Sequence, residues 1–114
     1  MTVRIERRDT AGNVVVALRG DLDLDSAPTV REALIEAMGE APAPRIVVDL
    51  EGLDFIDSAG LGVLVGGLER ARSMDGELVL VATGRSVVKV LELTGLTRVF
   101  EIHPSLSAAL GVPG

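Results

Sequence analysis

Residues 46–68 read IVVDLEGLDFIDSAGLGVLVGGL, and this stretch decides the fold of the chain. The β-branched, apolar run within Arg45–Leu50 is typical of a buried strand. A short polar turn follows, and apolar residues at helical spacing then predict a helix over Ala59–Ser73. One hydroxyl, that of Ser58, lies where this helix should begin, a position at which serine is usually a cap.

The predicted helix is unusually rich in glycine. Gly60, Gly62, Gly66 and Gly67 all fall within it, although a glycine in a helix interior costs roughly 1 kcal/mol relative to alanine. We interpret these glycines as access to the helix backbone for a binding partner. For Gly66 and Gly67, close packing of the helix on the sheet is an alternative interpretation.

The residues before this stretch predict a hairpin and a helix. Val3–Arg8 alternates apolar and charged residues as an exposed edge strand does, Asp9–Asn13 is a turn cluster, and Val14–Leu18 is a second apolar run. An acidic loop over Gly20–Asp25 comes next. Asp25 or Ser26 can cap the following helix, whose core face is formed by Val30, Ala33, Leu34, Ala37 and Met38.

The residues after it continue the alternation of strands and helices. We expect a strand over Glu77–Ala82, a helix over roughly Ser86–Thr94, a short strand over Arg98–Ile102 and a terminal helical turn within Pro104–Leu110. Such alternation implies parallel strands joined by crossover helices. The predicted fold class is α/β, a mixed sheet of four to five strands with an N-terminal antiparallel hairpin and three to four helices.

The composition argues against several classes of function. A chain of 114 residues suits one domain, expected over residues 1–110 with a frayed tail at 111–114. A net charge of −6 and 2% aromatic residues argue against nucleic-acid binding, and no apolar run is long enough to cross a membrane. The absence of cysteine rules out disulfides and thiolate metal sites. We expect a cytoplasmic protein without cofactors, a monomer or weak dimer.

The segment VVDLEGLDFIDSAGLGVL closely resembles the central motif of STAS domains, above all the stand-alone anti-sigma factor antagonists. The strand containing Asp49, the turn Phe55–Ser58 and the helix start Gly60–Gly62 stand in register with that motif. The resemblance covers nearly the whole chain, since it extends to Gly20–Asp23, Ala27–Pro28, Leu91–Leu96 and Phe100.

This resemblance implies a switch operated by phosphorylation of Ser58. The free-hydroxyl form would bind an anti-sigma factor, a serine kinase with its own ATP site, and so free a sigma factor. The kinase would then phosphorylate Ser58 and lose its partner, and a metal-dependent PP2C-type serine phosphatase would reset the switch. The expected partner-binding residues are Asp23, Asp57, Ser58, Ala59, Gly60, Leu61, Gly62, Val63 and Gly66.

Several acidic residues allow plainer interpretations. Asp54 and Asp57 can be turn formers or partner contacts, and Asp49 can be a carboxylate at a strand end. Asp21, Asp23 and Asp25 resemble a magnesium cluster, but three acids in one loop are more often simply solvated. We therefore expect no metal site and no catalytic residue. His103, the only histidine, is expected to be structural.

Two other functions suit the same pattern. A STAS accessory subunit of a lipid transporter, or a module of a larger signalling complex, would share the fold, but the intact serine argues against both. A receiver domain phosphorylated on Asp49 has the right size. It lacks an acidic pair at the end of its first strand, and Lys89 comes only six residues after Thr83, too soon for a separate later strand.

Overall fold

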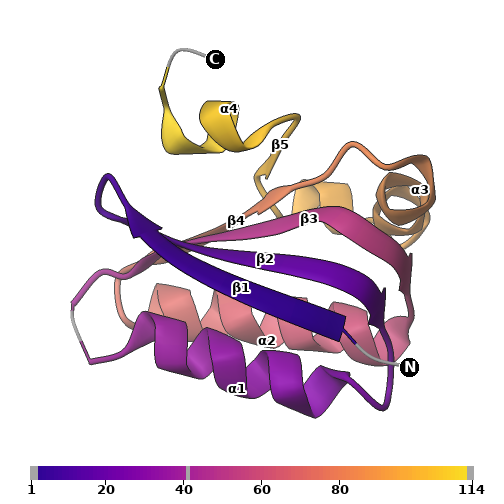
Figure 1. Cartoon of the computed structure of the whole chain (residues 1–114), viewed down its shortest axis with the longest axis horizontal. Coiled ribbons are helices and arrows are strands. Elements are labelled where there is room, and N and C mark those ends of the chain that lie inside the picture. The colour runs from indigo at the N-terminus through magenta and orange to yellow at the C-terminus, as the bar shows by residue number, and fades with distance from the viewer. Residues whose placement is uncertain (1–2, 41, 113–114) are drawn as a thin grey trace.

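A five-stranded sheet runs through the part of the chain that the computed structural model describes, residues 3–40 and 42–112. The elements follow the order β1 (Val3–Thr10), β2 (Asn13–Leu22), α1 (Ala27–Met38), β3 (Arg45–Ile56), α2 (Ser58–Ser73), β4 (Glu77–Val81), α3 (Arg85–Leu93), the 3-10 turn η1 (Leu96–Arg98), β5 (Ile102–His103) and α4 (Leu106–Leu110) (Figure 1). The predicted mixed sheet with its N-terminal hairpin is confirmed.

The strands lie in chain order across the sheet, with β1 antiparallel to β2 and the other neighbours parallel. Thr10 pairs with Asn13 around a two-residue turn in which Ala11 and Gly12 both have positive φ. Such turns match the right-handed twist of a hairpin. The other end of the sheet is β5, so β1 and β5 are its edge strands.

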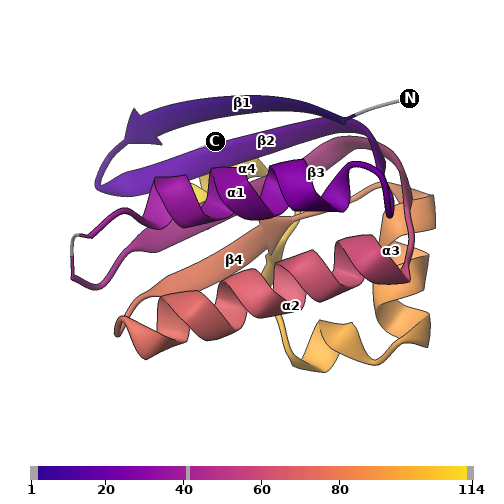
Figure 2. The ribbon, with the colours of Figure 1, turned by 90° about the horizontal axis from the view of Figure 1, so that it is seen from below.

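Helices cover both faces of the sheet. The helices α1 and α2 lie side by side on one face, and α3 and α4 lie on the other (Figures 1 and 2). Alternate strand residues therefore enter two cores. The larger core joins Val16, Leu18, Val48, Leu50, Leu78 and Leu80 to α1 and α2. It also includes Val87 and Leu91 of α3, so the two cores are not divided strictly between the two faces. The smaller joins Val15, Val47, Val79 and Val81 to Ala109 of α4.

The strand predicted over Arg45–Leu50 is longer than expected, because β3 continues to Ile56. A β-bulge allows this: Ala17 of β2 pairs with Asp49, but Arg19 pairs with Gly52. The Asp49 carboxylate accepts a hydrogen bond of 3.0 Å from the Glu51 N–H within the bulge. The extra residues break the regular alternation of polar and apolar side chains, which is the signal that a sequence pattern can detect.

The C-terminal part also differs from expectation. The strand predicted over Arg98–Ile102 is replaced by η1 and the two-residue β5, and Val99 is exposed. His103 lies in β5, where its Nε2 is 2.6 Å from the Glu101 carboxylate. Of the predicted frayed tail, residues 113–114 lie outside the described residues, and the N–H of Val112 still bonds to the Ser107 carbonyl at 3.1 Å.

Candidate functional site

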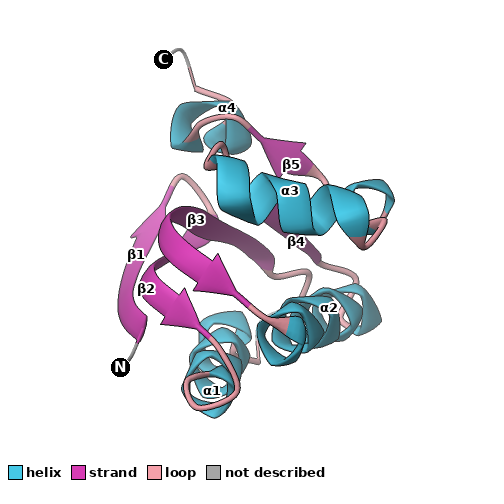
Figure 3. Ribbon diagram, turned by 90° about the vertical axis from the view of Figure 1, so that its right-hand side faces the viewer, coloured by secondary structure: helices cyan, strands magenta, loops and turns pink. Residues whose placement is uncertain are grey.

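The candidate site lies at the carboxyl ends of the inner strands β2 and β3. In Figure 3, these strand ends face the viewer. Leu22 and Ile56 pair at the ends of these parallel strands. The loop before α1 and the first turn of α2 therefore emerge next to each other. In open α/β sheets, binding sites commonly lie outside the carboxyl ends of the strands.

Asp57 joins the two connections. One oxygen of its carboxylate accepts from the Gly60 N–H at 3.0 Å, and the other accepts from the Leu24 N–H at 3.0 Å. Its own N–H donates to the Leu22 carbonyl at 3.2 Å. Asp57 is thus the N-cap of α2, and it holds the loop before α1 against the start of α2.

Ser58 is the first residue of α2 rather than its cap. Its side chain is exposed, and among the described residues its hydroxyl has no hydrogen-bond partner. Because Asp57 already performs the capping, the hydroxyl is not needed to hold the helix. It lies at the positive end of the helix dipole, where an anion is well tolerated.

Asp23 organises the loop before α1. One oxygen of its carboxylate accepts from the Ser26 N–H at 3.0 Å, from the Asp25 N–H at 3.1 Å and from the Ser26 hydroxyl at 3.1 Å. These bonds, the Ser26 N–H first, hold the pKa of Asp23 below its ordinary value of 3.8.

Ser26 occupies the N-cap position of α1, but its side chain does not cap the helix. The single proton of the hydroxyl is instead shared between the Asp21 carbonyl at 2.9 Å and the Asp23 carboxylate at 3.1 Å, and the hydroxyl oxygen accepts from the Asp23 N–H at 2.9 Å. Within residues 3–40 and 42–112, no group of three or more histidine or acidic side chains is arranged to hold a metal ion. Among the three acids of this loop, as the structure describes it, only the Asp23 carboxylate accepts hydrogen bonds, and their donors belong to the loop itself.

The glycines of α2 divide between its two faces. A Cβ at Gly60 would lie 2.7 Å from Leu22 Cγ and 2.8 Å from the Leu22 carbonyl oxygen, and one at Gly67 would lie 3.0 Å from Leu78 Cδ1. A Cβ at Gly62 or Gly66 would meet nothing within 4 Å. The close packing considered for Gly66 and Gly67 is thus found at Gly67, and also at Gly60, but not at Gly66.

The residues expected to contact a partner also fall into a buried group and an accessible group. Gly60 and Leu61 are buried, and Leu61 is only 8% exposed. Ser58, Gly62 and Gly66 are exposed, and Asp23, Asp57, Ala59 and Val63 are half-buried. The exposed and half-buried members form one continuous strip from the loop before α1 along the outer side of α2.

This strip continues into a groove between α1 and α2 with a volume of about 340 Å³, which we call the α1–α2 groove. The residues that line it on α1 are Arg31, Leu34, Ile35 and Met38, and those on α2 are Ala59, Gly62, Val63, Gly66, Gly67 and Arg70. Figure 2 looks directly onto these two helices. The open glycines thus leave space beside the helix rather than close contact within it.

Sequence reasoning missed two apolar side chains near Ser58. Leu24, whose N–H is bonded to Asp57, is 73% exposed, and Phe55, near the end of β3, is 50% exposed. The alternation of leucines and aspartates over Asp21–Asp25 could not reveal this, because it contains both the buried Leu22 and the exposed Leu24. Exposed apolar residues beside a polar site are common in docking surfaces.

The described part of the chain contains no helix that is both long enough and apolar enough to span a bilayer.

Known proteins are similar to this chain over most of its length. The anti-sigma F factor antagonist of Paenibacillus polymyxa is 31% identical over 110 residues, covering 96% of this chain and 94% of that protein. The anti-sigma-B factor antagonist of Listeria monocytogenes is 35% identical over 103 residues, covering 90% and 88%. The crystal structure of an anti-sigma factor antagonist from Mycobacterium paratuberculosis superposes with a TM-score of 0.86 at 30% identity, covering 96% of this chain and 92% of that chain.

The family model of the STAS domain matches residues 3–109, which include the sheet, the Asp57 cap and Ser58. Together with the relatives named anti-sigma factor antagonist, this match establishes that the chain belongs to the STAS domain family.

Proposed function

We propose that this chain is an anti-sigma factor antagonist that acts by binding, and not by catalysis, in the cytoplasm. Its unphosphorylated form binds an anti-sigma factor that is an ATP-dependent serine kinase, and this binding releases a sigma factor. Phosphorylation of Ser58 by that kinase ends the binding, and a PP2C-type phosphatase restores it. The names of the relatives support this proposal.

The observation that carries the proposal is an exposed hydroxyl that the fold does not use. Asp57 caps α2, so Ser58 is free to enter a kinase active site without unwinding the helix. The neighbouring side chains are small or absent at Ala59 and Gly62, and they leave room for a partner backbone. A hydroxyl engaged in capping would have to break that bond first.

Phosphate at this position would change the surface more than the fold. It adds about 1.5 to 2 negative charges to a chain whose net charge is already −6. The start of α2 accommodates an anion, so the domain stays folded. A partner surface shaped for a neutral hydroxyl must desolvate the phosphate, and a loss of about 3–4 kcal/mol weakens binding by roughly 100- to 1,000-fold.

The test is phosphorylation by purified GHKL-type serine kinases encoded in the same genome. With ATP and the cognate kinase, intact mass should rise by one phosphate, and peptide mapping should assign it to Ser58. Ser58→Ala should remain unmodified and stay bound when ATP is added. Ser73→Ala, at the exposed far end of α2, is the matched control and should behave as wild type. Phosphate on another residue, or ATP-driven release of Ser58→Ala, would contradict the proposal.

A further inference from the structure

The α1–α2 groove begins one residue beyond Ser58 and is not needed for the chemistry proposed there. The two helices follow parallel strands and therefore run in the same direction (Figure 2). Between Ala59 and Arg70, both of which line the groove, α2 rises about 16 Å at 1.5 Å per residue. That length corresponds to about three turns of a helix laid along the groove.

The apolar walls and open floor of the groove suit the ridge of an amphipathic helix. On the α1 side, Ile35 is half-buried above the buried Leu34 and Met38. On the α2 side, Ala59 and Val63 are the apolar side chains, and Gly62 and Gly66 leave open space beside them. A helix approaches another most closely where one of them carries small residues. The two glycines cost helix stability without any packing that requires them, so they mark space that the isolated domain leaves unused.

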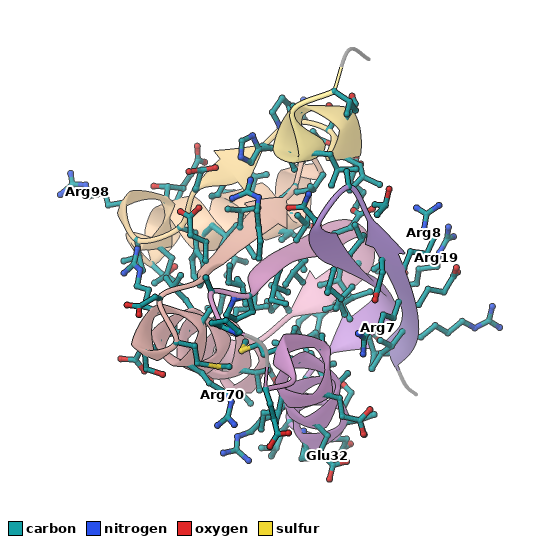
Figure 4. The ribbon with its side chains drawn as sticks, turned by 90° about the vertical axis from the view of Figure 1, so that its left-hand side faces the viewer. Arg7, Arg8, Arg19, Glu32, Arg70 and Arg98 are labelled. Carbon is teal, nitrogen blue, oxygen red and sulfur yellow. The ribbon has the colours of Figure 1, made fainter. Side chains whose placement is uncertain are left out.

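The charged residues that line the groove are both arginines, although the chain is acidic overall. Arg31 lies in the first half of α1, toward the Ser58 end, and Arg70 lies in the last turn of α2. None of the salt bridges formed among the described residues involves either guanidinium. Figure 4 shows Arg70 projecting away from the sheet, far from Arg7, Arg8 and Arg19 on the strands.

We propose that the α1–α2 groove binds an amphipathic helix of the anti-sigma factor kinase, with carboxylates at its two ends that pair with Arg31 and Arg70. This inference rests on the proposed function, because it assigns the occupant to the partner that acts on Ser58. The groove is continuous with that site through Ala59. The phosphorylated residue and the groove would then form one interface, with separate contributions to affinity.

The experiment measures the affinity of the cognate kinase, without ATP, for two groove variants and two matched controls. Gly66→Leu fills the groove from a position where a Cβ meets nothing within 4 Å, and Arg70→Glu reverses one charge. Glu69→Leu and Arg72→Glu make comparable changes at exposed positions of α2 outside the groove. Circular dichroism and thermal melting confirm that each variant is folded.

We expect Gly66→Leu and Arg70→Glu each to raise Kd by about 10-fold or more, and the controls to stay within about 2-fold of wild type. Unchanged Kd for both groove variants, with Ser58→Asp still weakening the complex, would overturn the groove assignment and leave the proposed function intact. Equal losses in the groove variants and the controls would also overturn it. If no kinase binds or phosphorylates the wild-type chain, both proposals fail together.

Discussion

The two faces of α2 carry the same residue type for different reasons. On the inner face, Gly60 and Gly67 allow the helix backbone to approach Leu22, Leu34 and Leu78, so these glycines belong to the fold. On the outer face, a Cβ at Gly62 or Gly66 would meet nothing within 4 Å, so packing does not require glycine there. A glycine kept where an alanine would be more stable indicates a surface shaped for something outside the chain.

The largest effect is expected from the inner face, at Gly60. The change Gly60→Ala places a methyl group 2.8 Å from the carbonyl oxygen of Leu22, which is backbone and cannot turn aside. Such overpacking should lower the free energy of unfolding by about 1–3 kcal/mol. Urea denaturation measures this value. Wild-type stability in Gly60→Ala would show that the inner glycines are not packing devices.

The next effect is expected at Asp57, where the two connections meet. Asp57→Ala removes the cap of α2 and the acceptor of the Leu24 N–H, and it should lower the free energy of unfolding by about 0.5–2 kcal/mol. Asp57→Asn keeps one carbonyl acceptor and should lose less. Hydrogen exchange of the Leu24 amide should accelerate in both variants, and unchanged exchange would mean that Asp57 does not hold the loop.

A smaller effect of the opposite sign is expected on the outer face. Gly62→Ala and Gly66→Ala should each raise the free energy of unfolding by about 0.5–1 kcal/mol, because alanine loses less backbone entropy and meets no neighbour. Gly67→Ala is the control, since its methyl group would press on two movable side-chain ends and offset the gain. Destabilisation by either outer alanine, seen in thermal melting, would erase the distinction between the faces.

The smallest effect concerns the loop that Asp57 holds. The lowered pKa of Asp23 means that its carboxylate stabilises the folded state above the ordinary carboxyl pKa of 3.8 and loses that contribution as pH falls through the lowered value. Ser26→Ala removes the hydroxyl donor but keeps the Ser26 backbone N–H, so the pKa of Asp23 should rise only part of the way. An NMR titration of the Asp23 side chain measures it, and an unchanged pKa would contradict this assignment.

The sequence predicted the sheet, the hairpin and the helices that follow β2 and β3, because long runs with a clear hydrophobic period dominate those segments. It did not predict the extension of β3 to Ile56, because a bulge shifts the alternation after Asp49. The sequence suggested Ser58 as the cap of α2, whereas Asp57 is the cap and Ser58 is the first residue of the helix. Both residue types are good caps, and only the geometry distinguishes them.

Helical periodicity was enough to place Gly60 and Gly67 on the buried face of α2, because they share the spacing of Leu64 and Ala71. It could not show how closely their backbone approaches Leu22 and Leu78, which come from distant strands. The α1–α2 groove could not be predicted for the same reason, because its walls belong to two helices that β3 separates in the sequence. Long-range contacts of this kind are set by tertiary packing and leave no local pattern.

The most direct measurement compares the affinity of the cognate anti-sigma factor kinase for the unmodified protein and for protein stoichiometrically phosphorylated on Ser58. If the exposed hydroxyl is the switch, phosphorylation should raise Kd by roughly 100- to 1,000-fold while the melting temperature changes little. Equal affinity of the two forms, or tighter binding of the phosphorylated form, would contradict the switch.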